Sequence, residues 1–163
     1  MRIKSIVYDG IFNVVDQSTL AIKYGEFLAK TLYVYIGVVE KILTMGYEPL
    51  NQPIIPGSSG VVRLIEDPSG RYGESSGKVA VVSPIGVNGV LGLDLNGLLA
   101  SYTGVYEKYI YEYVVEPKPL HAIKPYVAYA VSIGERVVEP VLIIGCEIVS
   151  IALAMYLSKA RGI

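Results

Sequence analysis

Apolar and polar residues alternate over the first part of the chain, which is typical of half-buried β-strands. Residues 2–8 alternate in this way and lead into an Asp-Gly turn pair, and residues 11–15 are again apolar. This arrangement predicts a β-hairpin. Residues 26–36 continue the apolar character and predict a third, longer strand.

The pattern then changes from that of a strand to that of a helix. Apolar residues over 37–45 follow a helical spacing, and Gly46 comes where a helix would end. Proline and glycine over 53–57 predict a loop. Residues 60–65 and 78–82 are rich in β-branched side chains and are separated by turn-forming residues, so we expect two paired strands.

Glycine recurs over residues 83–97, which predicts an irregular loop without regular structure. Residues 98–115 then predict strand. Prolines over 119–125 interrupt the strand pattern, and residues 126–133 predict a helix that ends at Gly134.

The C-terminal part has a different character. Residues 140–144 form a continuous apolar run, typical of a buried parallel strand, and residues 147–161 form a strongly apolar helix. Together they predict half of a βαβ unit. The predicted fold class is therefore mainly β over residues 1–138, followed by one strand and one helix over residues 139–163.

Composition narrows the possible functions. Apolar residues make up 52% of the 163 residues, which is enough for a packed core. The 14 basic and 15 acidic residues nearly balance, so the chain has no broad positive field that would attract nucleic acid. A single cysteine and a single histidine leave no cysteine-built metal site within one chain. Charges interrupt residues 1–8, and residues 148–158 are too few to span a bilayer. We therefore expect a cytoplasmic protein without a membrane anchor.

Short motifs in this order resemble the medium-chain, zinc-type alcohol dehydrogenase family. That resemblance implies a GroES-like domain, a partly open β-barrel with short helices, followed by a truncated Rossmann unit. The motifs are residues 7–10 (Val-Tyr-Asp-Gly), 25–30 (Gly-Glu-Phe-Leu-Ala-Lys), 53–57 (Pro-Ile-Ile-Pro-Gly), 77–84 (Gly-Lys-Val-Ala-Val-Val-Ser-Pro), 98–102 (Leu-Leu-Ala-Ser-Tyr), 141–145 (Val-Leu-Ile-Ile-Gly) and 159–162 (Lys-Ala-Arg-Gly).

The resemblance also identifies the positions of the family's catalytic zinc ligands, which this sequence does not keep. Gly37 stands at the cysteine ligand, Ser58-Ser59 replaces a His-Glu pair, and Lys124 replaces the glutamate of a Glu-Pro pair. Val39 occupies the place of the hydroxyl residue that relays the alcohol proton. Residues 85–96 contain no ligand set for the structural zinc of many relatives. The expectation is a protein without zinc.

The dinucleotide fingerprint Gly-x-Gly-x-x-Gly of the family would fall on residues 145–150. Gly145 is kept, whereas Glu147 and Ser150 replace the second and third glycines. Glu147 brings a negative charge to the helix N-terminus that would otherwise attract a pyrophosphate. The acidic residue that binds the ribose would lie beyond Ile163. We therefore expect no bound nicotinamide cofactor and only vestigial binding residues.

The positions of several other reactive or charged side chains can each be interpreted in two ways. Glu40, Lys41, Asp94 and Lys124 either face the former active-site cleft or are ordinary surface charges. His121 is expected to be a partly exposed loop residue rather than a general base, and Cys146 is expected to be part of the core.

Residues Tyr109, Tyr111 and Tyr113 would share one face if they lie in a single strand. Such a face could stack on nucleic-acid bases, but neighbouring glutamates favour cross-strand aromatic packing instead.

Two functions remain. The first is a degenerate, non-catalytic relative of alcohol dehydrogenase that serves as a structural or binding module. The second is a zinc-independent, NAD(P)-linked oxidoreductase similar to quinone reductases, or a subunit completed by a dehydrogenase-like partner chain. In either case the apolar residues 140–163 predict a homo-oligomer, most simply a dimer.

Overall fold

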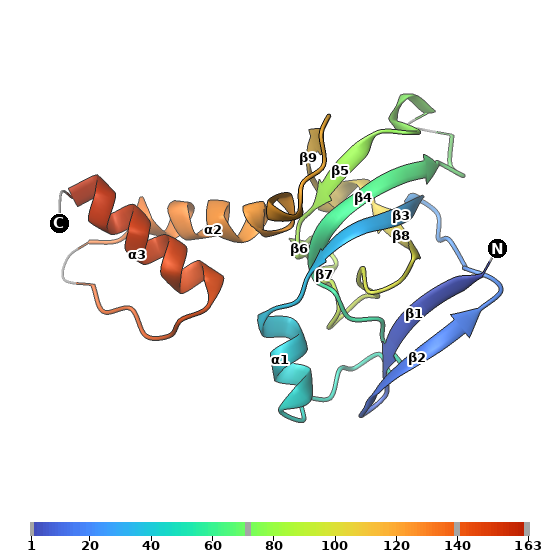
Figure 1. The fold of residues 1–163 in the computed structure, drawn as a ribbon, viewed down its shortest axis with the longest axis horizontal. Helices are drawn as coiled ribbons and strands as arrows, with labels where there is room; N and C mark the ends of the chain where they lie inside the picture. The colour runs from blue at the N-terminus through green and yellow to red at the C-terminus, as the bar shows by residue number, and fades with distance from the viewer. Residues whose placement is uncertain (1, 71–72, 139–140, 162–163) are drawn as a thin grey trace. The chain divides into compact units, whose positions relative to one another are not determined.

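A computed structural model describes residues 2–70, 73–138 and 141–161 (Figure 1). The chain divides into two compact units, Met1–Ala122 and Ile123–Ile163. We describe each unit separately. In the described part of the chain, no helix combines the length and the hydrophobicity needed to cross a membrane.

The first unit opens with the predicted hairpin. Strands β1 (Ile3–Tyr8) and β2 (Phe12–Gln17) pair antiparallel, with Ser5 opposite Val15. Gly10 makes the turn with a φ of 104°, a backbone conformation that side chains disfavour. The rings of Tyr8 and Phe12 pack across the hairpin with centroids 5.0 Å apart.

A five-stranded antiparallel sheet forms the body of this unit, with the strand order β8-β3-β4-β5-β9. Its central strand β4 pairs with β3 and β5, as expected for residues 60–65 and 78–82. The mainly β fold class is thereby confirmed. The strand bounds are β3 (Glu26–Tyr35), β4 (Ser59–Glu66), β5 (Val79–Val82), β8 (Tyr102–Tyr106) and β9 (Ile110–Val114).

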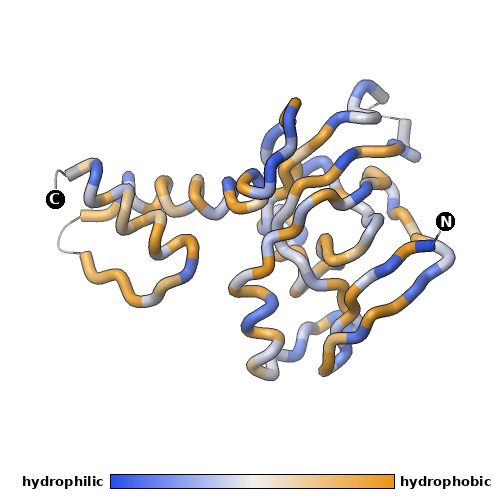
Figure 2. Tube along the Cα trace, viewed as in Figure 1, coloured by the Kyte–Doolittle hydropathy of each residue, from blue (hydrophilic) through white to orange (hydrophobic). Residues whose placement is uncertain are grey.

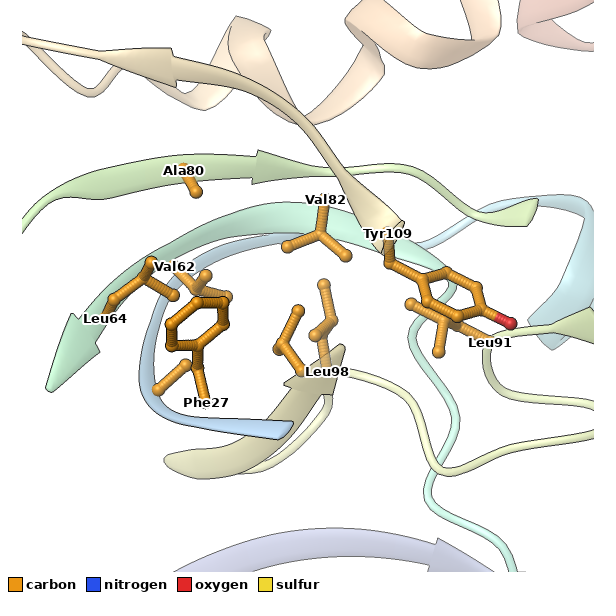
Figure 3. Close-up of a cluster of buried hydrophobic side chains, with 10 residues drawn as sticks. Phe27, Val62, Leu64, Ala80, Val82, Leu91, Leu98 and Tyr109 are labelled. Carbon is orange, nitrogen blue, oxygen red and sulfur yellow. The ribbon is translucent and has the colours of Figure 1, made fainter. Parts of the chain in front are cut away.

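Both faces of the central strands are covered. Phe27 of β3 and Val62 of β4 belong to the main apolar cluster on one face, together with Leu98 from the segment before β8 (Figure 3). A second cluster lies on the other face, where Val61 of β4 packs with Ala122, the last residue of the first unit. Because β4 is buried on both sides, it reads as an apolar run rather than as an alternating pattern.

Helix α1 (Val38–Thr44) is the predicted short helix and follows β3 directly. Its residue Leu43 packs with Tyr8 and Ile54 in a third cluster. The Tyr8 hydroxyl donates a 3.0 Å hydrogen bond to the carbonyl of Leu43, so the hairpin holds the C-terminal end of α1.

Two predictions for the middle of the chain are wrong in detail. Residues 83–97 contain two short paired strands, β6 (Ile85–Gly86) and β7 (Gly89–Val90), rather than only irregular loop. Residues 98–115 do not form one continuous strand, because the 3-10 turn η2 (Glu107–Tyr109) separates β8 from β9. Two further 3-10 turns are η1 (Gly73–Ser75) and η3 (Pro119–Ile123).

The turn η2 also overturns the predicted tyrosine face. Tyr109 lies in the turn and is fully buried, where its hydroxyl donates to the Gly89 carbonyl at 2.9 Å. Tyr111 and Tyr113 lie in β9 and are about half exposed. The three rings therefore do not share a face, because the turn breaks the period of two.

The second unit contains helices α2 (Lys124–Gly134) and α3 (Ile148–Arg161), which pack against each other. A β-carbon on Gly134 would lie 2.5 Å from Cδ1 of Tyr156, so glycine permits the close approach of the helices. The predicted helices 126–133 and 147–161 are thus confirmed.

The predicted strand over residues 140–144 is not formed at 141–144, which have no regular secondary structure, and Pro140 lies outside the described residues. A strand needs a hydrogen-bonded neighbour, and the described residues of this unit provide none. Cys146 is exposed rather than part of the core, because the segment before α3 lies at the surface.

Two leucines offer a matched test of the core. Leu98 is 1% exposed in the main cluster, whereas Leu50 is 92% exposed. We expect Leu98→Ala to lower the free energy of unfolding by about 2–5 kcal/mol, since it leaves a cavity, and Leu50→Ala to change it by less than about 0.5 kcal/mol. Urea denaturation measures both, and equal effects would contradict the packing described here.

Candidate functional site

The candidate site lies where β3 passes into α1, beside the loop that leads into β4. Gly37 is the residue before α1, and Gly57 and Ser58 precede β4. The main-chain N–H groups of Gly37 and Gly57 donate to the same carboxylate, that of Glu40. The fold therefore brings together the two segments that carry the predicted site residues of this unit.

Glu40 is the central group of this site. It is only 6% exposed, and its Oε2 accepts the Gly37 N–H at 2.7 Å while its Oε1 accepts the Gly57 N–H at 2.8 Å. Glu40 is in the first turn of α1, where the helix dipole favours a negative charge. Both carboxylate oxygens thus accept hydrogen bonds from backbone donors, so Glu40 is a buried, paired carboxylate and not an ordinary surface charge.

The side-chain position of residue 37 is occupied by a neighbour. A β-carbon built on Gly37 would lie 2.6 Å from Cζ and 2.8 Å from Oη of Tyr35, which is inside van der Waals contact. Tyr35 is partly buried and packs against the cluster that contains Val61. A cysteine at residue 37 would therefore have to displace this ring.

The other predicted positions of this unit are buried. Ser58 and Ser59 are both 0% exposed, and Val39 is 4% exposed. The Ser59 hydroxyl lies 2.8 Å from the carbonyl oxygen of Val82 and 2.7 Å from that of Ala122. The hydroxyl has one proton and donates it to one of these two carbonyls at a time, so its hydrogen bonds are made to the main chain of the protein.

The glycine at position 57 is required by the backbone. Its φ of 97° is disfavoured for side chains, and a β-carbon there would lie 2.7 Å from the amide nitrogen of Leu99. The Leu98 N–H donates to the Gly57 carbonyl at 2.8 Å, and the Leu99 N–H donates to Pro56 at 2.9 Å. The segment before Ser58 is thereby fixed on both sides.

These residues do not fit a catalytic zinc ion. Gly37 has no donor atom, Ser58 offers a hydroxyl that binds zinc poorly, and the carboxylate of Glu40 is engaged by two N–H groups. Among residues 2–70, 73–138 and 141–161, no three His, Cys, Asp or Glu side chains are grouped to hold a metal ion. Gly37 and Ser58 belong to the first unit, whereas Lys124 is the first residue of α2 in the second unit. Only Gly37 and Ser58 are therefore compared as parts of one site.

The predicted dinucleotide residues lie around the start of α3. Gly145 has a φ of 120°, Glu147 immediately precedes the helix, and Ser150 lies in its first turn. The Glu147 carbonyl accepts the Ile151 N–H at 3.0 Å, so the carboxylate-bearing residue is the one just before the first residue of the helix. The arrangement does not fit a pyrophosphate, because a carboxylate stands at the anion-attracting end of the helix and residues 141–146 form no strand before it.

A small cavity lies elsewhere in the first unit, between the end of β8 and the loop around Leu95. Its volume is about 60 Å³, and its lining includes Glu26, Thr103 and Tyr106. Burial raises the pKa of Tyr106, and the nearby carboxylate of Glu26 raises it further. A volume that corresponds to about two water molecules cannot hold a nicotinamide.

The remaining candidates lie outside this site. His121 is partly exposed, as expected, and its Nδ1 accepts the Lys118 N–H at 3.2 Å within the turn η3. Asp94 is half-buried and accepts the Val90 N–H at 2.7 Å, and Lys41 is exposed. None of these placements provides a nucleophile beside a base.

Sequence reasoning named Glu40 only as a possible cleft or surface charge, and it did not name Tyr35. Glu40 stands three positions after Gly37, which is the spacing of a capping box, so its bond to the Gly37 N–H has a sequence signal. The bond to Gly57 and the position of the Tyr35 ring depend on the tertiary fold and have no local signal.

Comparison with solved structures identifies the fold. The chain is similar to 2R,3R-butanediol dehydrogenase from Bacillus subtilis, with a TM-score of 0.75 and 16% sequence identity, over 97% of this chain and 55% of that one. The fold is that of the zinc-type alcohol dehydrogenases. A cobalt- and zinc-bound thermostable alcohol dehydrogenase from Pyrobaculum aerophilum also matches the alcohol dehydrogenase fold described here, with a TM-score of 0.71 and 18% identity, over 99% of this chain and 56% of that one.

A quinone oxidoreductase from Coxiella burnetii is a more distant match, with a TM-score of 0.58 and 18% identity, over 83% of this chain and 46% of that one. The chain thus spans about half the length of the solved structures that it matches. No protein-family model matches the sequence, and no curated protein does. The resemblance to alcohol dehydrogenases is therefore one of fold.

Removing the charge of Glu40 tests this site. Glu40→Gln keeps one carbonyl oxygen but replaces the other oxygen by an amide donor that faces an N–H group. We expect the free energy of unfolding to fall by about 1–3 kcal/mol. Glu48→Gln makes the same chemical change at an exposed position and should cost less than about 0.5 kcal/mol. Urea denaturation of the two variants distinguishes them, and equal stabilities would show that Glu40 does not hold these segments together.

Proposed function

We propose that this chain is a degenerate relative of alcohol dehydrogenase that works without zinc, as a non-catalytic structural or binding module. The observation that carries the proposal is the closed site at Gly37. The Tyr35 ring occupies the side-chain space at that position, and the Glu40 carboxylate binds the two flanking backbone N–H groups. The groups that would bind a metal are therefore absent or already engaged.

The chemistry of the family requires more than its fold. A Lewis acid must polarise the alcohol or carbonyl oxygen, and a hydroxyl must relay the proton. In this chain Val39 is a buried aliphatic residue at the relay position, and Ser58 and Ser59 are buried hydroxyls. These residues support packing rather than proton transfer, which favours a non-catalytic role.

The residues around α3 support the same proposal for the nucleotide. Glu147 carries a carboxylate at the start of the helix, where a dinucleotide would place its own negative charge. Like charges at this position would weaken the binding of a pyrophosphate by their repulsion.

A second candidate function is a zinc-independent, NAD(P)-linked oxidoreductase, or a subunit of one that a dehydrogenase-like partner chain completes. The similarity to the quinone oxidoreductase from Coxiella burnetii favours this alternative, since it extends over 83% of this chain. The two candidates differ in nucleotide binding, which the non-catalytic module lacks.

Metal and nucleotide binding test the proposed function. We expect purified protein to hold less than about 0.1 zinc per chain after dialysis against micromolar zinc, and to give no saturable change in NADPH or NADH fluorescence. Elemental analysis and a fluorescence titration measure these quantities. One firmly held zinc per chain would contradict the proposal, and saturable micromolar binding of NAD(P)H without zinc would favour the oxidoreductase alternative.

Reinstating the cysteine tests the closed site directly. We expect Gly37→Cys to lower the free energy of unfolding by about 1–3 kcal/mol, because the new side chain collides with the Tyr35 ring. The same substitution in a Tyr35→Ala background should cost much less, since the ring is absent. Thermal or urea denaturation of the four proteins in this double-mutant cycle gives the coupling. Equal costs of Gly37→Cys in both backgrounds would show that Tyr35 does not close this position.

A further inference from the structure

The segment between β5 and β8 contains the two places in the chain where asparagine precedes glycine, Asn88-Gly89 and Asn96-Gly97. Glycines and polar residues interrupt the hydrophobic residues over 85–99 (Figure 2). Because glycine has no β-carbon, an Asn-Gly step is the least hindered place for a main-chain nitrogen to reach a side-chain amide. The two steps have the same local chemistry, so the fold decides which of them reacts.

The fold holds the second step on both of its reacting groups. Oδ1 of Asn96 accepts the Ile55 N–H at 3.0 Å, and the Gly97 N–H donates to the Ile55 carbonyl at 2.6 Å. Gly97 is buried, and a β-carbon there would collide with the carbonyl oxygen of Gly57. For the nitrogen of Gly97 to attack the Asn96 side chain, both bonds to Ile55 would have to break inside a closely packed segment.

The first step lies at the tip of a very short hairpin. Strands β6 and β7 have two residues each and pair with Gly86 opposite Gly89, so Val87 and Asn88 form the connecting loop. Val87 is 72% exposed, and Asn88 is also exposed. A ladder of two residues at the surface opens at a low free energy. The nitrogen of Gly89 can therefore reach the Asn88 side chain without disturbing the core.

The main chain immediately after this step is held by the core. The Tyr109 hydroxyl, which points away from Phe27 in Figure 3, donates to the Gly89 carbonyl at 2.9 Å. The Val90 N–H donates to Oδ2 of Asp94 at 2.7 Å, and a β-carbon on Gly89 would lie 2.5 Å from that same oxygen. A change of main-chain length before Gly89 would therefore break these contacts.

We propose that Asn88 is a site of spontaneous deamidation, and that isoaspartate formed there releases the Gly89 carbonyl from Tyr109. The main-chain nitrogen of Gly89 forms a bond to Cγ of Asn88. The bond from Cγ to the side-chain nitrogen breaks, and this nitrogen leaves as ammonia with the proton that Gly89 loses. Water then opens the five-membered imide. Opening at Cγ gives aspartate, and opening at the main-chain carbonyl carbon gives isoaspartate.

The two products differ in their effect on the hairpin. Both add a carboxylate to a loop whose next residue, Gly89, already lies against Asp94. Isoaspartate also lengthens the main chain by one carbon before Gly89, which moves the Gly89 carbonyl away from the Tyr109 hydroxyl. Tyr109 is fully buried, so its hydroxyl would lose an acceptor in the core, which lowers stability. The isoaspartate form is therefore less stable than the aspartate form of equal mass and charge.

Prolonged incubation of the purified chain in mildly alkaline buffer tests the site. Peptide mapping by liquid chromatography and mass spectrometry separates the asparagine, aspartate and isoaspartate forms, since each deamidation adds about 1 Da. We expect Asn88 to deamidate about tenfold faster than Asn96 in the folded protein, because Asn96 reacts only after a larger local opening. In guanidinium chloride the two rates should converge, since a glycine follows each asparagine.

Two variants serve as controls for this measurement. Asn88→Gln would have to close a larger ring, so it should abolish the early deamidation, whereas Asn96→Gln should leave it unchanged. Equal rates at Asn88 and Asn96 in the folded protein would overturn the proposed site. A faster reaction at Asn96 would overturn it as well, because the fold would then not protect the step that it holds.

The release from Tyr109 has a separate test. The isoaspartate form, isolated by chromatography, should unfold at a lower urea concentration than Asn88→Asp, which has the same charge on a main chain of normal length. In a Tyr109→Phe background this difference should shrink, because the hydroxyl that loses its acceptor is already absent. Equal urea midpoints of the isoaspartate form and Asn88→Asp, or a difference that persists in full in Tyr109→Phe, would contradict the release of Tyr109.

Discussion

The carboxylate of Glu40 is the interaction on which the arrangement of this site depends. It joins the first turn of α1 to the segment before β4 through the N–H groups of Gly37 and Gly57. That segment is in turn bonded to Leu98 and Leu99, and Leu99 accepts a hydrogen bond from Ile6 of the hairpin. The buried carboxylate is stable here because two short hydrogen bonds and the N-terminus of a helix take the place of the water molecules that would otherwise hydrate it. Glu40 thus joins the helix to a segment that main-chain hydrogen bonds connect, through Leu99, to the hairpin.

This interaction also supports the proposal that the site works without zinc. The resemblance to alcohol dehydrogenases places zinc ligands at Gly37 and Ser58, where the structure has a closed, internally bonded corner. Tyr35 completes the closure by occupying the space of the missing side chain. A fold can persist while its chemistry is lost, because the strands and their core are stabilised independently of the site. The proposal of a non-catalytic module is based on this separation between fold and chemistry.

The sequence predicted the parts of the fold that have local signals. The hairpin around Gly10 and the short helix after Gly37 follow from turn chemistry and apolar spacing. It failed at Tyr109, where a 3-10 turn changes the strand period, and at residues 141–144, where apolar character indicated a strand that has no neighbour to pair with. The second bond of Glu40 could not be predicted, since Gly57 meets it only after the chain has folded.

The most direct test of the central claim is a zinc titration followed by the backbone amide signals of Gly37 and Gly57 in nuclear magnetic resonance spectra. The account predicts two strongly downfield, slowly exchanging amides, as expected for short bonds to a carboxylate, and no change in either signal at a tenfold excess of zinc. Rapid exchange of these amides, or a zinc-dependent shift of both that saturates at one metal per chain, would contradict it.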